Sequence, residues 1–164
     1  MNRTDLALLI IRSVFGVFML LHGVNKIRSG LGGTAGWFGS IGMRRPALQA
    51  RTAAWTEIGA GALFAAGLLT PLAAAAIISV MCVAIITVHL KVGFFIFLPG
   101  GGWEYCASIA AVAAAVAVAG PGSASLDDLL GWTTGPVVGV LAVAVGLAAA
   151  ACHLALSWRP GATQ

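Results

Sequence analysis

The sequence predicts an all-α, polytopic membrane protein, built as a four-helix bundle with an additional fifth transmembrane helix. Of its 164 residues, 60% are hydrophobic and only 9% are charged, whereas a soluble domain is usually about one quarter charged. The apolar residues also fall into long runs, each close to the roughly 20 residues that a helix needs to cross a bilayer. The length allows four or five such helices and leaves no room for a soluble domain.

The first transmembrane helix is expected over residues 5–27. Small or polar residues recur along it at steps of three or four and form one stripe: Arg12, Gly16, Met19, Gly23 and Lys26. Because such a stripe lets helices approach closely, it is expected to face the rest of the bundle. Arg12 lies well inside the apolar run and needs a partner there. Glu57 and a backbone carbonyl are the candidates for that partner.

The connector over residues 28–51 combines five glycines with aromatic and basic side chains, among them Trp37, Arg44 and Arg45. The glycines are expected to break any long helix. A mixture of aromatic and basic residues is typical of a segment that lies in the headgroup layer. An interfacial anchor and a lid over a binding site are therefore the two interpretations of the connector, and the anchor is preferred.

The remaining apolar runs are divided by turn-forming residues. The third run is long enough to tilt or to break near Gly93, and Ser125 ahead of two acidic residues predicts the start of a short capped helix. Residues 1–130 are expected to form the four-helix core, and residues 131–164 the fifth helix with a short polar tail. The later spans are expected at residues 52–69, 71–98, 103–119 and 136–158.

The net charge of +4 is read as a topology signal, because the few basic residues border apolar runs. Nucleic acid is therefore not an expected partner. The basic residues gather on one side of the predicted membrane, which places that side in the cytoplasm and the N-terminus outside. Cys82, Cys106 and Cys152 lie in separate apolar runs, where a cysteine is usually a small buried hydrophobe. A dithiol relay within the chain is disfavoured.

Six ionisable residues are expected to meet at one membrane face, because antiparallel spans bring alternate helix ends together. Each residue alone would be costly in hydrocarbon, and pairing lowers that cost. Two interpretations stay open: a salt-bridge network that fixes helix packing, and a polar pocket that moves protons or holds a polar head group. The six residues are His22, Lys26, Glu57, His89, Lys91 and Glu104.

The pocket interpretation assigns a role to each residue type. Glu57 and Glu104 are the candidates for proton transfer, and His22 or His89 for donation to a quinone carbonyl. The candidate binding residues are Lys26, Lys91, Trp37 and Trp103. A metal site is not expected, since helix-end residues at these spacings form no recognised ligand motif. His153 stands alone near the end of the fifth span and is expected to be structural.

At these positions the sequence resembles the DoxX family of small bacterial membrane proteins over about residues 6–130. The resemblance implies a four-helix core and a multi-pass protein of the bacterial inner membrane. It also implies a link to thiosulfate:quinone oxidoreductase and to assemblies that handle thiols or oxidative stress. It rests on His22-Gly23-x-x-Lys26, Glu57 with Gly59-x-Gly61, Gly67-Leu68-x-Thr70-Pro71, the His89 region with Gly93-Phe94-Phe95, and Gly101-Gly102-x-Glu104.

Two functions follow from this reading. The preferred one is a non-catalytic accessory subunit of a larger membrane complex, for example a respiratory complex, docked through the alanine–glycine faces of its fourth and fifth helices. It is preferred because no cofactor-binding motif is visible. The alternative is a membrane subunit that passes electrons from a thiol or sulfur donor to quinone. A small-molecule carrier is a third reading. Lipid and other membrane subunits are the expected partners.

Overall fold

The computed structural model describes residues 1–161, in which all the named elements are helical. The last three residues of the predicted polar tail, 162–164, lie outside the described residues. The all-α prediction is confirmed. The elements are α1 (Arg3–Arg28), α2 (Leu31–Ser40), α3 (Pro46–Ala66), α4 (Thr70–Ala84), the π-helical turn η1 (Ile85–His89), α5 (Glu104–Ala119), α6 (Leu126–Leu129) and α7 (Pro136–Ser157).

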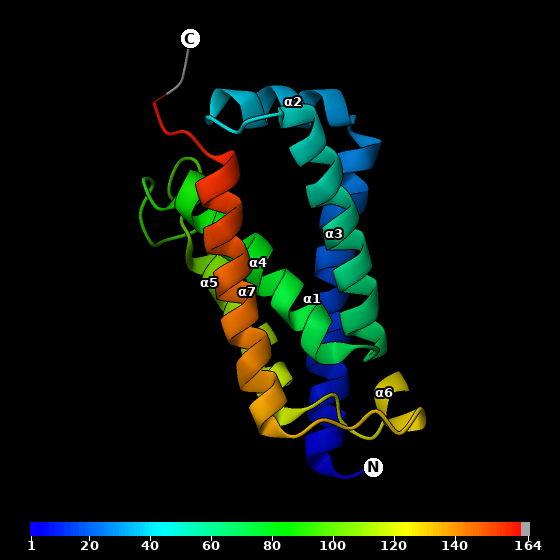
Figure 1. Cartoon of the computed structure of the whole chain (residues 1–164). Coiled ribbons are helices and arrows are strands. Elements are labelled where there is room, and N and C mark those ends of the chain that lie inside the picture. Colours follow the sequence, from blue (N-terminus) through cyan, green and yellow to red (C-terminus); the bar gives the residue numbers. More distant parts are fainter. Residues whose placement is uncertain (162–164) are drawn as a thin grey trace.

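The helices form two groups that are joined at one end (Figure 1). In the first group α3 packs against α1 and α2, and in the second α4, α5 and α7 pack against one another. α4 also contacts α3 and so connects the groups. Three segments of the described chain are long and apolar enough to cross a membrane, namely Arg3–Arg28, Thr70–His89 and Pro136–Ser157, and α5 is a shorter apolar helix. The chain is therefore an all-helical membrane protein.

The predicted stripe on the first helix is the surface that packs against α3. Arg12, Gly16, Met19 and Gly23 are the buried residues of α1. A Cβ added at Gly16 would lie 2.6 Å from the backbone nitrogen of Ala65, so the two helices are in backbone contact there. Lys26, the last member of the stripe, keeps 22% of its side chain exposed. The small residues thus bring α1 and α3 together, as expected of helices in lipid.

Arg12 is satisfied by backbone carbonyls rather than by Glu57. Its guanidinium donates to the carbonyl oxygen of Ala65 at 2.5 Å, to that of Pro121 at 3.1 Å, and to that of Ala124. These carbonyls belong to the end of α3 and to the segment that precedes α6. Arg12 therefore ties α1 to two other parts of the chain at the end of the bundle where the N-terminus lies (Figure 1).

The short acidic helix α6 begins as predicted, with Ser125 accepting a hydrogen bond from the backbone N–H of Asp128. Asp127 has an additional role that the sequence did not indicate. Its carboxylate accepts from the N–H groups of Leu69 and Thr70 at 2.7 and 2.9 Å, and so caps the N-terminus of α4. This arrangement closes the end of the bundle opposite the C-terminus.

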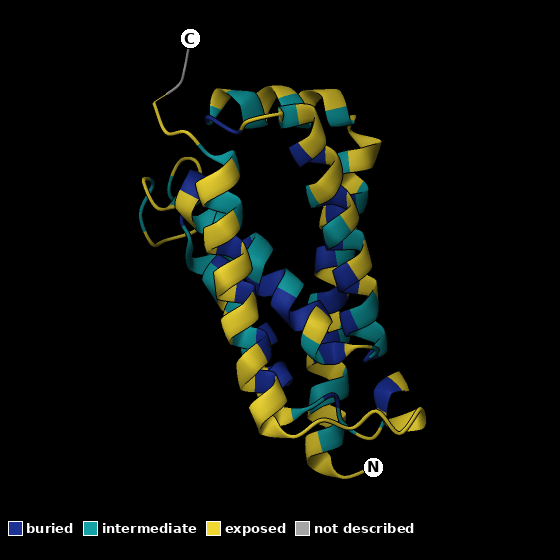
Figure 2. Cartoon of the chain, in the orientation of Figure 1, coloured by how far each residue is buried: buried dark blue, intermediate teal, exposed yellow. Residues whose placement is uncertain are grey.

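The fifth span is an integral part of the second helix group. Its small residues Gly139, Ala142, Gly146 and Ala150 are buried, and α7 packs on α4 and α5. These small residues, which were expected to dock a partner, therefore pack inside the bundle instead. Large apolar side chains cover the outer side of α7, which Figure 2 shows as exposed.

The connector is more helical than its glycines suggested. Residues Leu31–Ser40 form α2, and α3 begins at Pro46, six residues before the predicted start at Thr52. The link between α2 and α3 is fixed to the end of α7. Arg44 donates its N–H to the carbonyl of Ser157 at 2.7 Å, and the Trp158 indole donates to the carbonyl of Ile41 at 2.9 Å. α2 is thereby held across the open end of both groups (Figure 1).

The third span ends earlier than the predicted residue 98. α4 continues as the π-helical turn η1 and stops at His89. The chain then folds back on itself, with the N–H groups of Trp103 and Glu104 donating to the carbonyls of Gly93 and Phe94 at 3.0 and 2.9 Å. Gly93 has a φ of 116°, which glycine adopts without steric cost. The break near Gly93 allowed by the sequence is thus the one observed.

Candidate functional site

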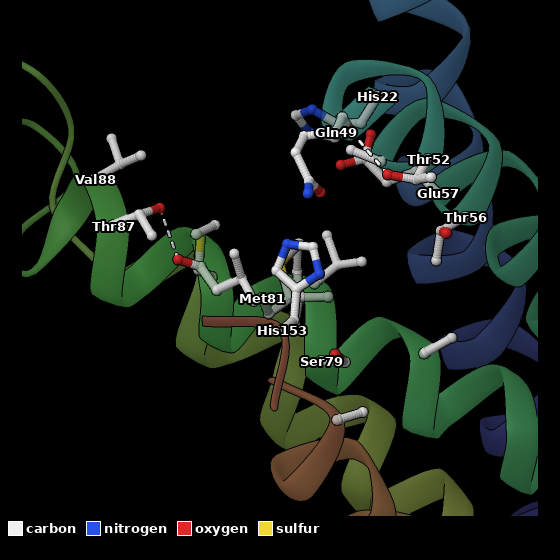
Figure 3. A pocket seen from close by; sticks show the side chains of 18 of the residues that line it. His22, Gln49, Thr52, Thr56, Glu57, Ser79, Met81, Thr87, Val88 and His153 are labelled. Carbon is white, nitrogen blue, oxygen red and sulfur yellow. Dashed lines mark hydrogen bonds between the residues drawn. The ribbon is translucent and has the colours of Figure 1, made fainter. Parts of the chain in front are cut away.

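A pocket of about 660 Å³ lies between the two helix groups. α3 packs on α1, α2 and α4, whereas α7 packs on α4 and α5. The pocket fills the space that this leaves between α3 and α7, beneath α2. It is lined mostly by apolar side chains, with a smaller set of polar groups (Figure 3). Such a composition is typical of sites that bind small molecules.

Lys26 and Glu57 form the ion pair at this pocket. The Lys26 ammonium lies 2.6 and 2.5 Å from the two carboxylate oxygens of Glu57. Only 6% of the Glu57 side chain is exposed. Lys26 lies in the last turn of α1 and Glu57 near the middle of α3, and both residues line the pocket. An ion pair in apolar surroundings is strengthened by the low local dielectric, so each group gives the other a polar partner that hydrocarbon would not offer.

His22 and Tyr105 add a second polar contact beside this pair. The Nε2 atom of His22 lies 3.4 Å from the Tyr105 hydroxyl, and the two rings have their centroids 6.0 Å apart. His22 comes from α1 and Tyr105 from the first turn of α5, so the contact joins the two helix groups. Both groups can donate or accept a hydrogen bond, which makes them suitable partners for an oxygen atom of a ligand.

His89 also lines the pocket and is fixed by the loop that follows it. Its Nδ1 atom lies 2.6 Å from the carbonyl oxygen of Gly101. Because a carbonyl only accepts, Nδ1 must carry the proton of this hydrogen bond. In the neutral ring Nε2 is then the acceptor. The loop thus selects one tautomer of His89.

The structure gathers five of the eight predicted site residues at the pocket and places three outside it. His22, Lys26, Trp37, Glu57 and His89 line the pocket. Lys91, Trp103 and Glu104 are absent from its lining. Glu104 instead accepts the backbone N–H of Ile96 at 3.1 Å, and Trp103 packs edge-to-face on Phe94 with centroids 4.7 Å apart. Glu104 and Trp103 thus contact the loop that follows His89, where the helix ends.

Several polar residues of the pocket were not predicted from the sequence: Gln49, Thr52, Thr56, Tyr105 and His153. Gln49 carried a usable signal, since it precedes Glu57 by eight residues and so lies near the same side of a helix. Gln49 was nevertheless not predicted, because α3 was expected to begin at residue 52, after Gln49. His153 was interpreted as structural, and no local pattern shows that α7 turns it towards α3.

The pocket fits an amphipathic ligand with a planar, oxygen-bearing head. Its apolar lining suits a hydrocarbon ring or chain, and Lys26, His22 and Tyr105 present hydrogen-bond donors at one wall. A quinone has these properties, so the residues present fit that group. Among the described residues, no three His, Cys, Asp or Glu side chains gather in a way that could hold a metal ion.

Comparison with known proteins finds a family match over the first three spans. The sequence profile of the DoxX family matches residues 7–90, a stretch that includes His22, Lys26, Gln49, Glu57 and His89. A curated relative from Bacillus subtilis (strain 168), named "Putative oxidoreductase CatD", is 35% identical over 95 residues, which cover 57% of this chain and 69% of the relative. No solved structure gives a significant match. The chain belongs to the DoxX family of membrane proteins.

Proposed function

We propose that this protein is a membrane subunit that binds a lipophilic quinone within an oxidoreductase assembly. The pocket between α3 and α7 is the observation that carries the proposal, because it joins an apolar interior to the Lys26–Glu57 pair at one wall. The relative named as an oxidoreductase supports the reaction class. As in the accessory role expected from the sequence, the protein works within a larger complex, because the electron donor belongs to a partner subunit.

The chemistry of this pocket is the reduction of a quinone to a quinol, which consumes two electrons and two protons. Two thiols that pair into a disulfide release the same number of both, so a thiol donor on a partner balances the reaction. Lys26 donates a hydrogen bond to a carbonyl oxygen, and Glu57 accepts and hands on a proton. The His22–Tyr105 contact offers a second donor beside them.

The proposed setting is the inner membrane of a bacterium, with α1, α3, α4, α5 and α7 as five spanning segments. The α2 connector, the 90–103 loop and the end of α7 lie at one end of the bundle, and the N-terminus at the other (Figure 1). The first end carries most of the basic residues. The positive-inside rule therefore places the α2 end on the cytoplasmic side.

The test is the quinone content of the full-length protein purified in mild detergent from its native membranes. The wild type is expected to retain quinone, and Glu57→Gln and Lys26→Met to lose it. A hydrogen bond to a charged group is worth about 1.5–3 kcal/mol, which corresponds to a loss of affinity of about ten- to a hundredfold. Thiol-dependent quinone reduction, measured in the same membranes, is expected to fall in parallel.

Asp128→Asn is the matched control, because Asp128 is an exposed carboxylate on α6, at the opposite end of the bundle. It is expected to retain as much quinone as the wild type. Wild-type protein that carries only phospholipid and no quinone would contradict the proposal. Equal loss of quinone in Asp128→Asn and Glu57→Gln would show that the purification, and not the pocket, controls the occupancy.

A further inference from the structure

Gln49 is a largely buried residue whose amide has no hydrogen-bond partner in the described part of the chain. It lies in the first turns of α3 with only 9% of its surface exposed, and it lines the pocket. Figure 3 shows its amide group directed into the pocket. Buried polar side chains are nearly always hydrogen-bonded, and the Gln49 amide, which stays accessible from the pocket, has no such bond within residues 1–161. It is therefore free to bond to something that the pocket holds.

His153 approaches the same space from the other helix group. It lies near the end of α7, and Figure 3 shows its imidazole pointing towards the Gln49 amide across the pocket. Neither ring nitrogen has a hydrogen-bond partner among residues 1–161. His153 lies outside residues 7–90, which match the family profile. Two unpaired polar side chains thus face each other from α3 and α7.

The Gln49–His153 pair and the Lys26–Glu57 pair mark two polar regions of one pocket. Gln49 and Glu57 are eight residues apart on α3, so their Cα atoms are about 12 Å apart along the helix axis. The intervening Ala53 contributes an apolar side chain to the pocket wall. His153 enters the pocket from α7, on the side opposite Glu57, so a ring with oxygen atoms at opposite positions can present one oxygen to each region.

We infer that Gln49 and His153 form a second subsite, which binds the far oxygen of a ligand whose first oxygen lies at Lys26 and Glu57. The inference rests on the proposed function and specifies its substrate class as a para-quinone, which has carbonyls at opposite ring positions. An ortho-quinone, with adjacent carbonyls, would engage one polar region and leave the other unpaired.

The chemistry of the second subsite suits both redox states of such a ligand. The Gln49 amide has an N–H donor and a carbonyl acceptor, and a neutral imidazole has one nitrogen of each kind. A quinone carbonyl accepts from these donors, and a quinol hydroxyl donates to these acceptors. The subsite therefore holds the far oxygen before and after reduction without moving a charge into the pocket. Gln49 and His153 act as positioning residues.

The inference is tested by binding of 1,4-naphthoquinone and 1-tetralone, which share a fused ring system but have two carbonyls and one. Full-length protein in lipid nanodiscs is titrated with each probe, and binding is followed by tryptophan fluorescence, since Trp37 lines the pocket. Gln49→Leu and His153→Phe are each expected to weaken binding of 1,4-naphthoquinone by about fivefold or more, as the loss of one hydrogen bond implies. Binding of 1-tetralone is expected to stay within twofold of the wild type.

Cys152→Ala and Arg51→Gln are the control variants, because each changes an exposed side chain outside the pocket lining on the same helix as one test residue. Both are expected to bind each probe as the wild type does. Test variants that bind 1,4-naphthoquinone normally, or that lose both probes equally, would overturn the second subsite and leave the proposed function standing. A wild type that binds neither probe would overturn the proposed function and the subsite with it. Thermal unfolding of each variant confirms that it is folded.

Discussion

The ammonium of Lys26 on α1 lies within 2.6 Å of both carboxylate oxygens of Glu57 on α3. The pair is situated at the pocket, and the same two helices are in backbone contact deeper in the bundle through Gly16 and Gly61. The ion pair and the contact between small residues therefore hold α1 against α3 at two positions along the helices. Stability and ligand binding are linked at the first of these contacts.

Removing one member of the ion pair is expected to cost more than removing both. Lys26→Met leaves the Glu57 carboxylate buried without its cation, and breaking a buried pair in this way costs about 3 kcal/mol or more. The double variant Lys26→Met/Glu57→Leu removes the stranded charge and is expected to be more stable than Lys26→Met alone. Chemical unfolding in lipid–detergent micelles measures the difference. A double variant as unstable as the sum of the two single variants would contradict the prediction.

Arg12→Leu is expected to lower the free energy of unfolding by about 3 kcal/mol or more, since it deprives three carbonyls of a charged donor. Arg12→Lys is not expected to restore the loss, because a single ammonium cannot reproduce a planar fork that reaches Ala65, Pro121 and Ala124 together. Arg159→Gln is the control. Its guanidinium is exposed and donates to carbonyls at the end of its own helix, so the unfolding free energy should change by less than about 0.5 kcal/mol. Full rescue by lysine would show that charge alone matters.

Gly61→Ala is expected to destabilise the α1–α3 contact by about 1–3 kcal/mol, as overpacking does. A Cβ at Gly61 would lie 2.5 Å from the backbone nitrogen of Leu20 and 2.6 Å from the carbonyl oxygen of Gly16. At Gly59, on the same helix, an added Cβ meets no atom within 4 Å. Gly59→Ala should therefore leave stability unchanged or raise it by up to about 1 kcal/mol. Thermal unfolding of both variants is the measurement, and equal midpoints would contradict the prediction.

Asp127→Asn is expected to destabilise the start of α4 by about 1–3 kcal/mol, which is the cost of leaving a buried N–H without its acceptor. The carboxylate accepts from the N–H groups of Leu69 and Thr70, whereas an amide has only one acceptor oxygen. Asp128→Asn alters an exposed carboxylate next to it and should change stability by less than about 0.5 kcal/mol. Hydrogen exchange at Ala73, whose N–H donates to Leu69, reports the fraying of this helix end. Equal exchange rates in the two variants would show that the cap is dispensable.

The sequence predicted the structure correctly where a single physical requirement, the exclusion of polar side chains from lipid, acted on one helix face. The stripe on α1 was predicted because small and polar side chains must avoid lipid, and the buried residues Arg12, Gly16, Met19 and Gly23 confirm it. The need of Arg12 for an internal partner followed from the same reasoning. Which partner it finds depends on the loop before α6, which is distant in sequence and has no periodic pattern.

The candidate site was predictable in part for a related reason. The expectation that alternate helix ends meet at one membrane face located His22, Lys26, Glu57 and His89 at one site, and all four line the pocket. Glu57 nevertheless lies near the middle of α3, because this helix begins at Pro46. The same reasoning misplaced Glu104 and Lys91. Their positions depend on where α4 stops and on the hydrogen bonds that fold residues 93–104 back on themselves, and composition carries no record of such bonds.

By itself, the sequence determined that this chain is a helical membrane protein with the small and polar face of its first helix packed inward, because burial in lipid acts on each segment locally. Only the tertiary structure decided that α3 and α7 stand apart with a pocket between them, into which Gln49 and His153 project. It also decided that the small residues of α7 pack against α4 and α5. Those features arise from contacts between segments far apart in the chain, whose geometry is set by packing in three dimensions and not by the spacing of residues along one helix.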